Sequence, residues 1–313
     1  MKIRIRKHLL IAVCFALTMC NTTVKANAAT LPALPLPNAT FTSGNLTIMR
    51  YGSGPRTLIF IPGLGSGAWS WAEQISHFSK GDTVYALTLA GFDGTAFVPE
   101  PDLFASFSKD FWSFVAGQHL AHPVVIGHSL GGTLAIALAE QHPDELGGIV
   151  ALEGLPVFPA VAQSTAAQRT KLAQQAAGQI SGLTHAQFLA TEAQNMQSEG
   201  TLNSDLVPAS AALEATSDPK AVAAWLVADL DADLRPQLSA ISIPFLELAP
   251  YAPPAPFTQV QKVDFYQSLV QGAPHVTVEP IPNARHFAML DQPQAVDDAL
   301  AQFLASLPSP AGS

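Results

Sequence analysis

The sequence predicts an α/β protein with a mostly parallel sheet flanked by helices and one inserted helical segment. Short apolar runs that suit buried strands alternate with longer helical patterns along most of the chain. This is the order expected when parallel strands are joined by right-handed crossovers. The alternation stops between residues 154 and 240, where the chain is rich in Ala, Gln and Leu and has no convincing strand. We expect that segment to form a helical insertion.

Residues 1–28 are typical of a secretory signal peptide. A basic start at residues 1–7 precedes an apolar stretch at residues 9–19, and Ala26-Asn27-Ala28 forms a cleavage site. We therefore expect a periplasmic or secreted protein whose mature chain begins near Ala29. A lipid anchor at Cys20 is the less favoured alternative, because the preceding Met19 stands where a small residue is wanted.

The composition argues against several classes of partner. Five of the 15 Lys and Arg residues and none of the 24 Asp and Glu residues lie in the signal, so the mature chain has a formal net charge of −14. Such a surface repels phosphate backbones and anionic membranes, so we expect neither a nucleic acid partner nor a stable membrane anchor. Both cysteines, Cys14 and Cys20, also lie in the signal, so no disulfide is expected. The sequence has no metal-ligand spacing and no phosphate-binding loop, and it predicts no metal and no cofactor.

The strands can be assigned from apolar runs bounded by turn residues. The run 46–50 ends at the turn Gly52-Ser53-Gly54-Pro55, and the run 57–61 is apolar throughout, as expected of a strand covered on both faces. The same criteria predict five further strands, at residues 83–89, 124–126, 149–152, 244–248 and 275–278.

Helical patterns fill the intervals between these strands. They predict helices at residues 68–80, 102–119, 132–141, 168–179, 185–197, 220–230 and 293–307. The Pro-rich lead-in at residues 29–39 is expected to be extended, and the Pro- and Gly-containing tail at residues 308–313 to fray.

The motif Gly127-His128-Ser129-Leu130-Gly131 is the most informative stretch of the chain. It follows a predicted strand and precedes a helical pattern of small residues, which is the setting of a G-x-S-x-G nucleophile elbow. The sharp turn places the serine in a sparsely populated backbone conformation, so its neighbours must be small. The motif therefore predicts that Ser129 is a nucleophile.

Together these features resemble the α/β-hydrolase fold superfamily, in particular its serine esterase or lipase-like members with a helical cap. Besides the elbow, the resemblance rests on residues 61–65, 87–92 and 283–287, each of which follows a predicted strand. The resemblance implies a hydrolase core formed by residues 40–153 and 241–307. It implies that residues 154–240, called the cap below, are inserted after strand six. Pro62-Gly63 stands where the family usually has His-Gly, which removes a bracing side chain but no backbone donor.

A serine nucleophile needs a base, and the base needs an orienting carboxylate. The resemblance implies that His286, after the last strand and a turn, is the base, while His128 is expected to pack or cap. The family commonly has an Asp after strand seven, but Pro253 occupies that position within an acid-free run. Glu153, at the end of strand six, is therefore the predicted acid.

Three other carboxylates remain alternatives for the acid. They are Glu247, Asp231 and Asp233. We interpret Glu247 as a solvated carboxylate at the edge of a strand.

By analogy with the elbow rule, the backbone N–H groups of Leu64 and Leu130 are predicted to form the oxyanion hole. Trp69, Phe188 and Trp225 are candidates for the wall of the substrate pocket, with core packing as the alternative for each.

The residues favour hydrolysis of a small-molecule carboxylic ester through an acyl-enzyme. An amide, a lactone or a carbon–carbon bond could be cleaved by the same triad, and a cofactor-free haloperoxidase side reaction is a further alternative. A serine at the elbow argues against dehalogenase or epoxide hydrolase chemistry, for which relatives use an aspartate nucleophile. A catalytically idle small-molecule-binding protein of the same fold is the alternative from a different class.

Overall fold

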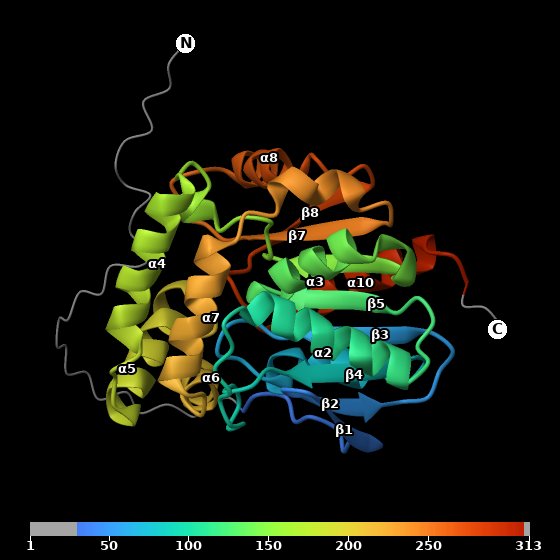
Figure 1. Cartoon of the computed structure of the whole chain (residues 1–313), viewed down its shortest axis with the longest axis horizontal. Helices are drawn as coiled ribbons and strands as arrows, with labels where there is room; N and C mark the ends of the chain where they lie inside the picture. Colours follow the sequence, from blue (N-terminus) through green and yellow to red (C-terminus); the bar gives the residue numbers. More distant parts are fainter. Residues whose placement is uncertain (1–29, 310–313) are drawn as a thin grey trace, which may run out of the picture.

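Eight strands form one sheet in the computed structural model, which describes residues 30–309 (Figure 1). Their order in the sheet is β1-β2-β4-β3-β5-β6-β7-β8. β2 pairs antiparallel with both β1 and β4, and the other pairings within this sheet are parallel. The strands are β1 (Ala39–Ser43), β2 (Leu46–Tyr51), β3 (Thr57–Ile61), β4 (Thr83–Thr88), β5 (Val124–His128), β6 (Gly148–Leu152), β7 (Phe245–Tyr251) and β8 (Val276–Pro282). The predicted fold class is confirmed.

Helices cover both faces of the sheet. One apolar cluster packs α2, α3 and α8 against one face, and a second packs α1 and α10 against the other. These helices are α1 (Ala72–Phe78), α2 (Leu103–Gly117), α3 (Leu130–Gln141), α8 (Gln259–Val270) and α10 (Pro293–Ser306), with the short α9 (Ala288–Asp291) before the last. The central strands are buried on both sides, which explains why their sequences are apolar throughout rather than alternating.

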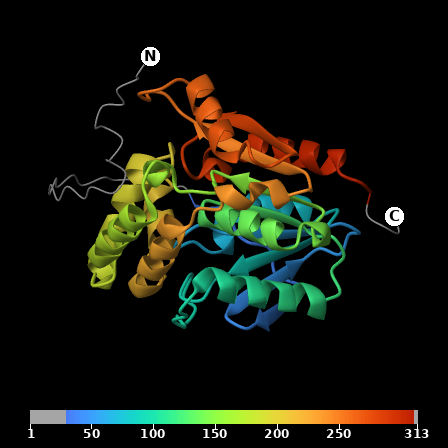
Figure 2. The same ribbon diagram turned by 45° about the horizontal axis from the view of Figure 1, so that its top comes forward.

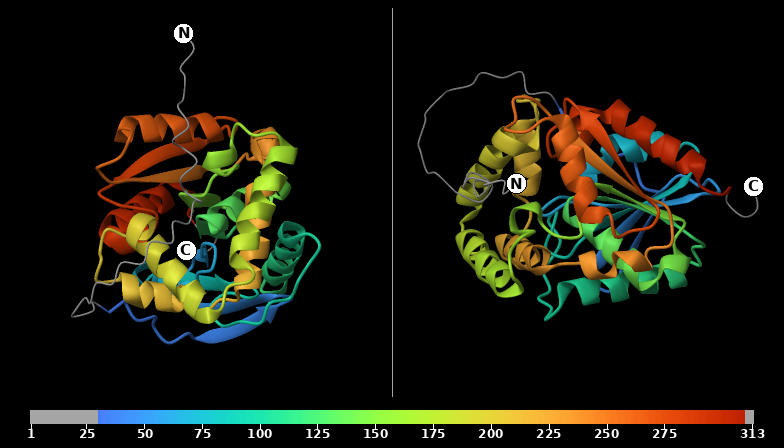
Figure 3. Two further views of the ribbon diagram at one scale, coloured as in Figure 1. Left: turned by 90° about the vertical axis from the view of Figure 1, so that its left-hand side faces the viewer. Right: turned by 90° about the horizontal axis from the view of Figure 1, so that it is seen from above.

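The cap contains four α-helices, all of them within the described part of the chain. They are α4 (Ala166–Ile180), α5 (His185–Asn195), α6 (Val207–Glu214) and α7 (Pro219–Asp231). α4 packs against α7, and α5 packs against α6. The views in Figures 1, 2 and 3 agree that this group lies at one end of the sheet rather than on either face. The cap begins directly after β6, so it lies at the end of the sheet where β5 and β6 finish.

Strand β1 and helices α6, α8 and the short α9 were not predicted from the sequence. β1 alternates half-buried with exposed residues and so has no apolar run, and α6 is only eight residues long. α8 buries three of its residues, and its apolar pattern is correspondingly weak. Its capping box, formed by Thr258 and Gln261, was the signal that could have revealed it.

The predicted signal peptide at residues 1–28 lies outside the described residues, as do residues 310–313 of the predicted tail. Within residues 30–309, no helix combines the length and apolar character that crossing a membrane requires.

Candidate active site

Ser129 lies in the turn between β5 and α3 with φ 52° and ψ −122°. Its flanking glycines leave no room for side chains: a Cβ on Gly127 would lie 2.1 Å from the carbonyl oxygen of Gly131, and one on Gly131 would lie 2.4 Å from that of Ile61. The backbone N–H of Ser129 donates to the carbonyl of Leu152 at 2.9 Å. The surrounding strands therefore hold the serine in a backbone conformation that is rare outside glycine.

Glu153 follows β6 and contacts the imidazole of His286. Its Oε2 lies 2.8 Å from His286 Nδ1. Its Oε1 accepts hydrogen bonds from Lys262 Nζ at 2.6 Å and from Tyr266 OH at 2.8 Å. Burial raises the pKa of Glu153, but the Lys262 ammonium and His286 outweigh burial and hold that pKa well below its usual range. The predicted acid thus lies in contact with the predicted base, and the catalytic roles of the two remain a prediction.

The cap holds the backbone on which His286 lies. The N–H groups of His286 and Phe287 donate to the carbonyls of Glu199 and Gly200 in the cap at 3.1 and 2.8 Å. The His286 side chain is 35% exposed. Within the described residues, neither Ser129 Oγ nor His286 Nε2 has a hydrogen-bond partner, so the serine and the imidazole are not bonded to each other. Such bonds often tighten only when substrate is bound.

His128 has the packing role expected of it. Its imidazole is fully buried, its Nε2–H donates to the carbonyl of His286 at 2.9 Å, and the two rings lie 4.5 Å apart. Burial, followed by the nearby His286, lowers the pKa of His128 to about 3. A neutral His128 thus packs against His286 and holds its backbone carbonyl, and it does not compete with His286 for the proton of the nucleophile.

The alternative carboxylates do not reach the base. Asp233 is engaged by Arg235 and Arg169, and Asp231 has no hydrogen bond to His286 within the described residues. Our interpretation of Glu247 as a solvated edge carboxylate is wrong. β8 lies outside β7 in the sheet, and Glu247 is completely buried.

The loop after β3 passes directly over the nucleophile. A Cβ on Gly63 would lie 3.3 Å from Ser129 Cβ, so the next residue, Leu64, is also close to the serine. Leu130 is the first residue of α3, and its N–H therefore has no partner within the helix. The geometry agrees with an oxyanion hole made by these two amides, a role that remains a prediction.

The cap also holds this loop. Ser66 Oγ donates to the carboxyl of Glu214 on α6, and Ser217 Oγ donates to the carbonyl of Gly65 at 2.7 Å. Ser66, Glu214 and Ser217 are all buried. The predicted oxyanion loop is thus fixed by side chains from the cap.

Comparison with known proteins identifies the family. The model of the Alpha/beta hydrolase family matches residues 58–299, which is well over half of the chain. The chain belongs to the alpha/beta hydrolase family. Its fold is the α/β-hydrolase fold.

Curated relatives match only part of the alpha/beta hydrolase chain. A stretch of 104 residues is 27% identical to RutD of Yersinia enterocolitica, named as a candidate carbamate hydrolase, and covers 33% of this chain and 37% of that protein. A stretch of 92 residues is 28% identical to epoxide hydrolase 3 of Xenopus tropicalis, covering 28% and 24%. The matches thus span about a third of the length of these relatives or less.

Solved structures share the hydrolase fold over most of the chain. An enol-lactonase from Burkholderia xenovorans LB400 has a TM-score of 0.66 at 19% identity, covering 86% of this chain and 98% of that one. A thermophilic esterase from Thermogutta terrifontis has a TM-score of 0.67 at 18% identity, covering 85% and 98%.

The three aromatic pocket candidates of this hydrolase are all buried. Trp69 stacks on Phe287, the neighbour of His286, with ring centroids 6.1 Å apart, and so lies beside the predicted base. Phe188 is part of the apolar cluster on the α2, α3 and α8 face, as is Trp225, which also packs near Phe92. The burial of Phe188 is therefore explained by core packing, and Trp225 also packs in this cluster.

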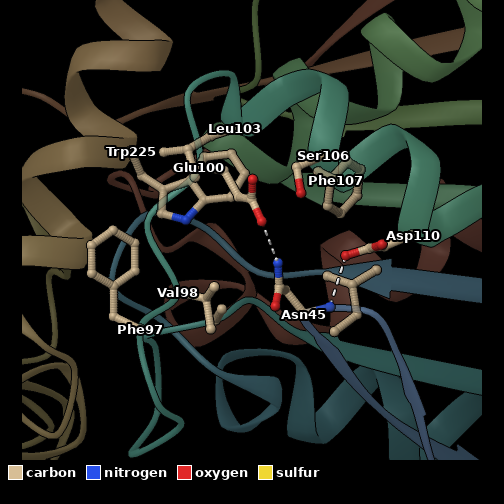
Figure 4. A pocket seen from close by; sticks show the side chains of 11 residues that line it. Asn45, Phe97, Val98, Glu100, Leu103, Ser106, Phe107, Asp110 and Trp225 are labelled. Carbon is tan, nitrogen blue, oxygen red and sulfur yellow. Dashed lines mark hydrogen bonds between the residues drawn. The ribbon is translucent and has the colours of Figure 1, made fainter.

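Trp225 also faces a small pocket away from the triad (Figure 4). The pocket lies between the cap, the start of α2 and the turn after β1, and Asn45 joins Glu100 and Asp110 there by hydrogen bonds. Its lining includes none of the three predicted triad residues. This pocket is therefore separate from the candidate active site.

Several carboxyl groups of the hydrolase bind protons more tightly in the folded state because they are buried. Burial is the first cause in each case. The pKa is raised to about 7 for Asp229 and Glu192, to about 8 for Glu140, and well above the ordinary value for Glu214 and Glu247. Unfolded carboxyl groups titrate near pH 4. Between about pH 5 and 8 the native state therefore holds protons that the unfolded chain releases.

We expect this hydrolase to become more stable as the pH falls from 8 to about 5.5. Stability decreases with rising pH wherever the native state binds more protons. Below pH 6.5 His128 lowers the stability of the folded state, because only the unfolded chain protonates it there. The several buried carboxyl groups outweigh this single group. Thermal unfolding followed by circular dichroism should give a higher midpoint at pH 5.5 than at pH 8, and Glu247→Gln should reduce the difference. A lower midpoint at pH 5.5 would contradict this expectation.

Proposed function

We propose that this hydrolase is an exported serine esterase that cleaves carboxylic esters through an acyl-enzyme. The observation that carries the proposal is the 2.8 Å contact between Glu153 Oε2 and His286 Nδ1, together with a serine held in a strained elbow. These three side chains come from the ends of three different strands. An ionised carboxylate, an oriented imidazole and a serine are the components of serine-based acyl transfer.

In this mechanism His286 Nε2 accepts the proton of Ser129 Oγ as the oxygen attacks the ester carbonyl. Glu153 stabilises the imidazolium that forms. The N–H groups of Leu64 and Leu130 donate to the developing oxyanion. His286 then protonates the leaving alkoxide and activates the water that hydrolyses the acyl-enzyme.

The serine distinguishes this site from that of an epoxide hydrolase, for which relatives use an aspartate at the elbow. Around the nucleophile, Leu64 and Leu130 are apolar, and the nearby Lys262 is engaged by Glu153. Small or medium esters without an anionic group suit such a site. An amide, a lactone or a carbon–carbon bond remains the alternative substrate for the same triad.

A substrate panel and an active-site label test the proposal together. The purified mature protein should react with a fluorophosphonate at Ser129 and should hydrolyse p-nitrophenyl esters of graded chain length. Matched anilides and lactones should react more slowly. Absence of labelling would contradict serine chemistry, and labelling with faster lactone or anilide turnover would change the substrate class.

Export is a separate proposal, supported by the sequence of residues 1–28. Cleavage after Ala28 should leave a mature chain that begins at Ala29. Mass spectrometry of the N-terminus from cell fractions measures this directly. A chain that begins at a lipidated Cys20, or one that retains Met1 in the cytoplasm, would overturn it.

A further inference from the structure

We propose that Lys262 and Tyr266 are positioning residues for the triad acid, and that Lys262 determines which of two neighbouring carboxyl groups, Glu153 or Glu247, is ionised. This inference rests on the proposed function and adds to it the groups that keep Glu153 charged. Both side chains come from α8, which follows the strand-seven loop from which the family's usual Asp is missing.

The contacts on Glu153 fix the orientation of its carboxylate. Lys262 Nζ and Tyr266 OH both donate to Oε1, which leaves Oε2 for His286 Nδ1. Lys262 and Tyr266 are four residues apart on a helix and thus project from the same face. The side chains of Lys262 and Glu153 are each 15% exposed, so solvent screens the pair only weakly. Rotating the carboxylate away from His286 would break these bonds as well.

Glu247 is the second carboxyl group in this region. It pairs across the sheet with Ala151, two residues before Glu153. Phe245 and Ala249 lie two residues before and after Glu247 in β7 and so share its face of the sheet, and both belong to the same apolar cluster as Tyr266. Glu247 therefore faces α8 on the side of the sheet where Tyr266 lies.

Only one of the two carboxyl groups has partners suited to a charge. Both oxygens of Glu247 are buried and have no hydrogen-bond partner among residues 30–309, so ionising it would be costly. Two neighbouring carboxyl groups titrate as a coupled pair, so a charge on Glu153 makes it harder to ionise Glu247. The Lys262 ammonium contacts Glu153 and so stabilises the negative charge where the imidazolium of His286 requires it. Burial and the charge on Glu153 keep the proton on Glu247.

The titratable groups near Glu153 come from several elements. They are His286 after β8, His128 on β5, Glu247 on β7, and Lys262 and Tyr266 on α8, while Asp229 on α7 acts on His286 from the cap. Lys262 is the sole Lys or Arg among these described groups. Removing its charge should therefore change the pH at which the acid becomes ionised.

The pH dependence of fluorophosphonate labelling and of ester kcat/KM tests the proposal. In Lys262→Met the acidic limb should move to higher pH by about one unit or more, as expected when an opposite charge in contact is lost. Lys262→Arg should restore the position of the limb. Tyr266→Phe, which removes a hydrogen bond but no charge, should lower the plateau rate a few-fold without moving the limb.

A double variant separates charge selection from simple packing. In Lys262→Met/Glu247→Gln the competing carboxyl group is absent, so at least half of the shift should disappear. Lys171→Met, at an exposed position on α4, is the matched control and should match the wild-type profile. If Lys262→Met does not fold, Lys262→Gln is measured with the same expected shift.

The outcomes distinguish this inference from the proposed function. A folded, labelled Lys262 variant with an unmoved acidic limb would overturn the inference alone. A limb shift that persists fully in the double variant would overturn the choice between the two carboxyl groups. A wild-type chain that is not labelled at any pH would contradict the proposed function, and the inference with it.

Discussion

Ser129→Ala should reduce kcat on the best ester of the panel by about 10⁴-fold or more. Alanine retains the elbow backbone and the oxyanion donors but cannot form the covalent intermediate, and the remaining terms do not replace it. The protein should fold normally, because the strained turn is held by Gly127, Gly131 and the hydrogen bond to Leu152. Steady-state kinetics measure the loss of kcat, and a thermal melt measures whether the variant folds normally.

The matched control for Ser129→Ala is a serine at a distance from the site. Ser268→Ala, at an exposed position on α8, should leave kcat within twofold and retain the fluorophosphonate label. Activity of Ser129→Ala within tenfold of the wild type would exclude the serine mechanism, whichever substrate is used.

Glu153→Gln should slow acylation by about 10²- to 10⁴-fold while preserving the fold. The amide has nearly the same shape but cannot stabilise the imidazolium, and its NH₂ group can favour the wrong imidazole tautomer. It also leaves Lys262 without its anionic partner. Pre-steady-state release of p-nitrophenol measures the acylation rate directly.

Asp231→Asn is the control for Glu153→Gln, because Asp231 was an alternative acid and has no hydrogen bond to His286 within the described residues. It should stay within a few-fold of the wild type. If Glu153→Gln turned over normally, or if Asp231→Asn caused the large loss, the acid would be assigned wrongly.

The sheet and the elbow could be predicted because their signals are local. β3, β5 and β6 are continuous apolar runs, and the strand–Gly127–Ser129–Gly131–helix order defines a single type of turn. The Glu153–His286 contact could be predicted because parallel strands bring their carboxyl ends to one edge. Its geometry is present, and the catalytic roles remain to be measured.

The groups behind the triad acid could not be predicted, because they depend on packing between distant segments. Lys262 lies 109 residues from Glu153, in a helix whose apolar pattern is weak and whose capping box says nothing of what the helix contacts. The environment of Glu247 was misjudged for a related reason. Its strand sequence does not reveal that β8 covers the outer edge of β7 or that α8 covers its face.

The N–H groups of His286 and Phe287 donate hydrogen bonds to the carbonyls of Glu199 and Gly200, and these bonds limit how the cap can move. Swinging the cap away would displace the predicted base and, through Glu214 and Ser217, the loop beside the serine. Any widely open form would therefore be a form in which the catalytic geometry is lost. Access to Ser129 and the position of His286 are therefore linked. A bulky ester that needs the cap lifted would reach Ser129 with His286 displaced. We therefore expect the cap to select substrates by size even where it does not contact them.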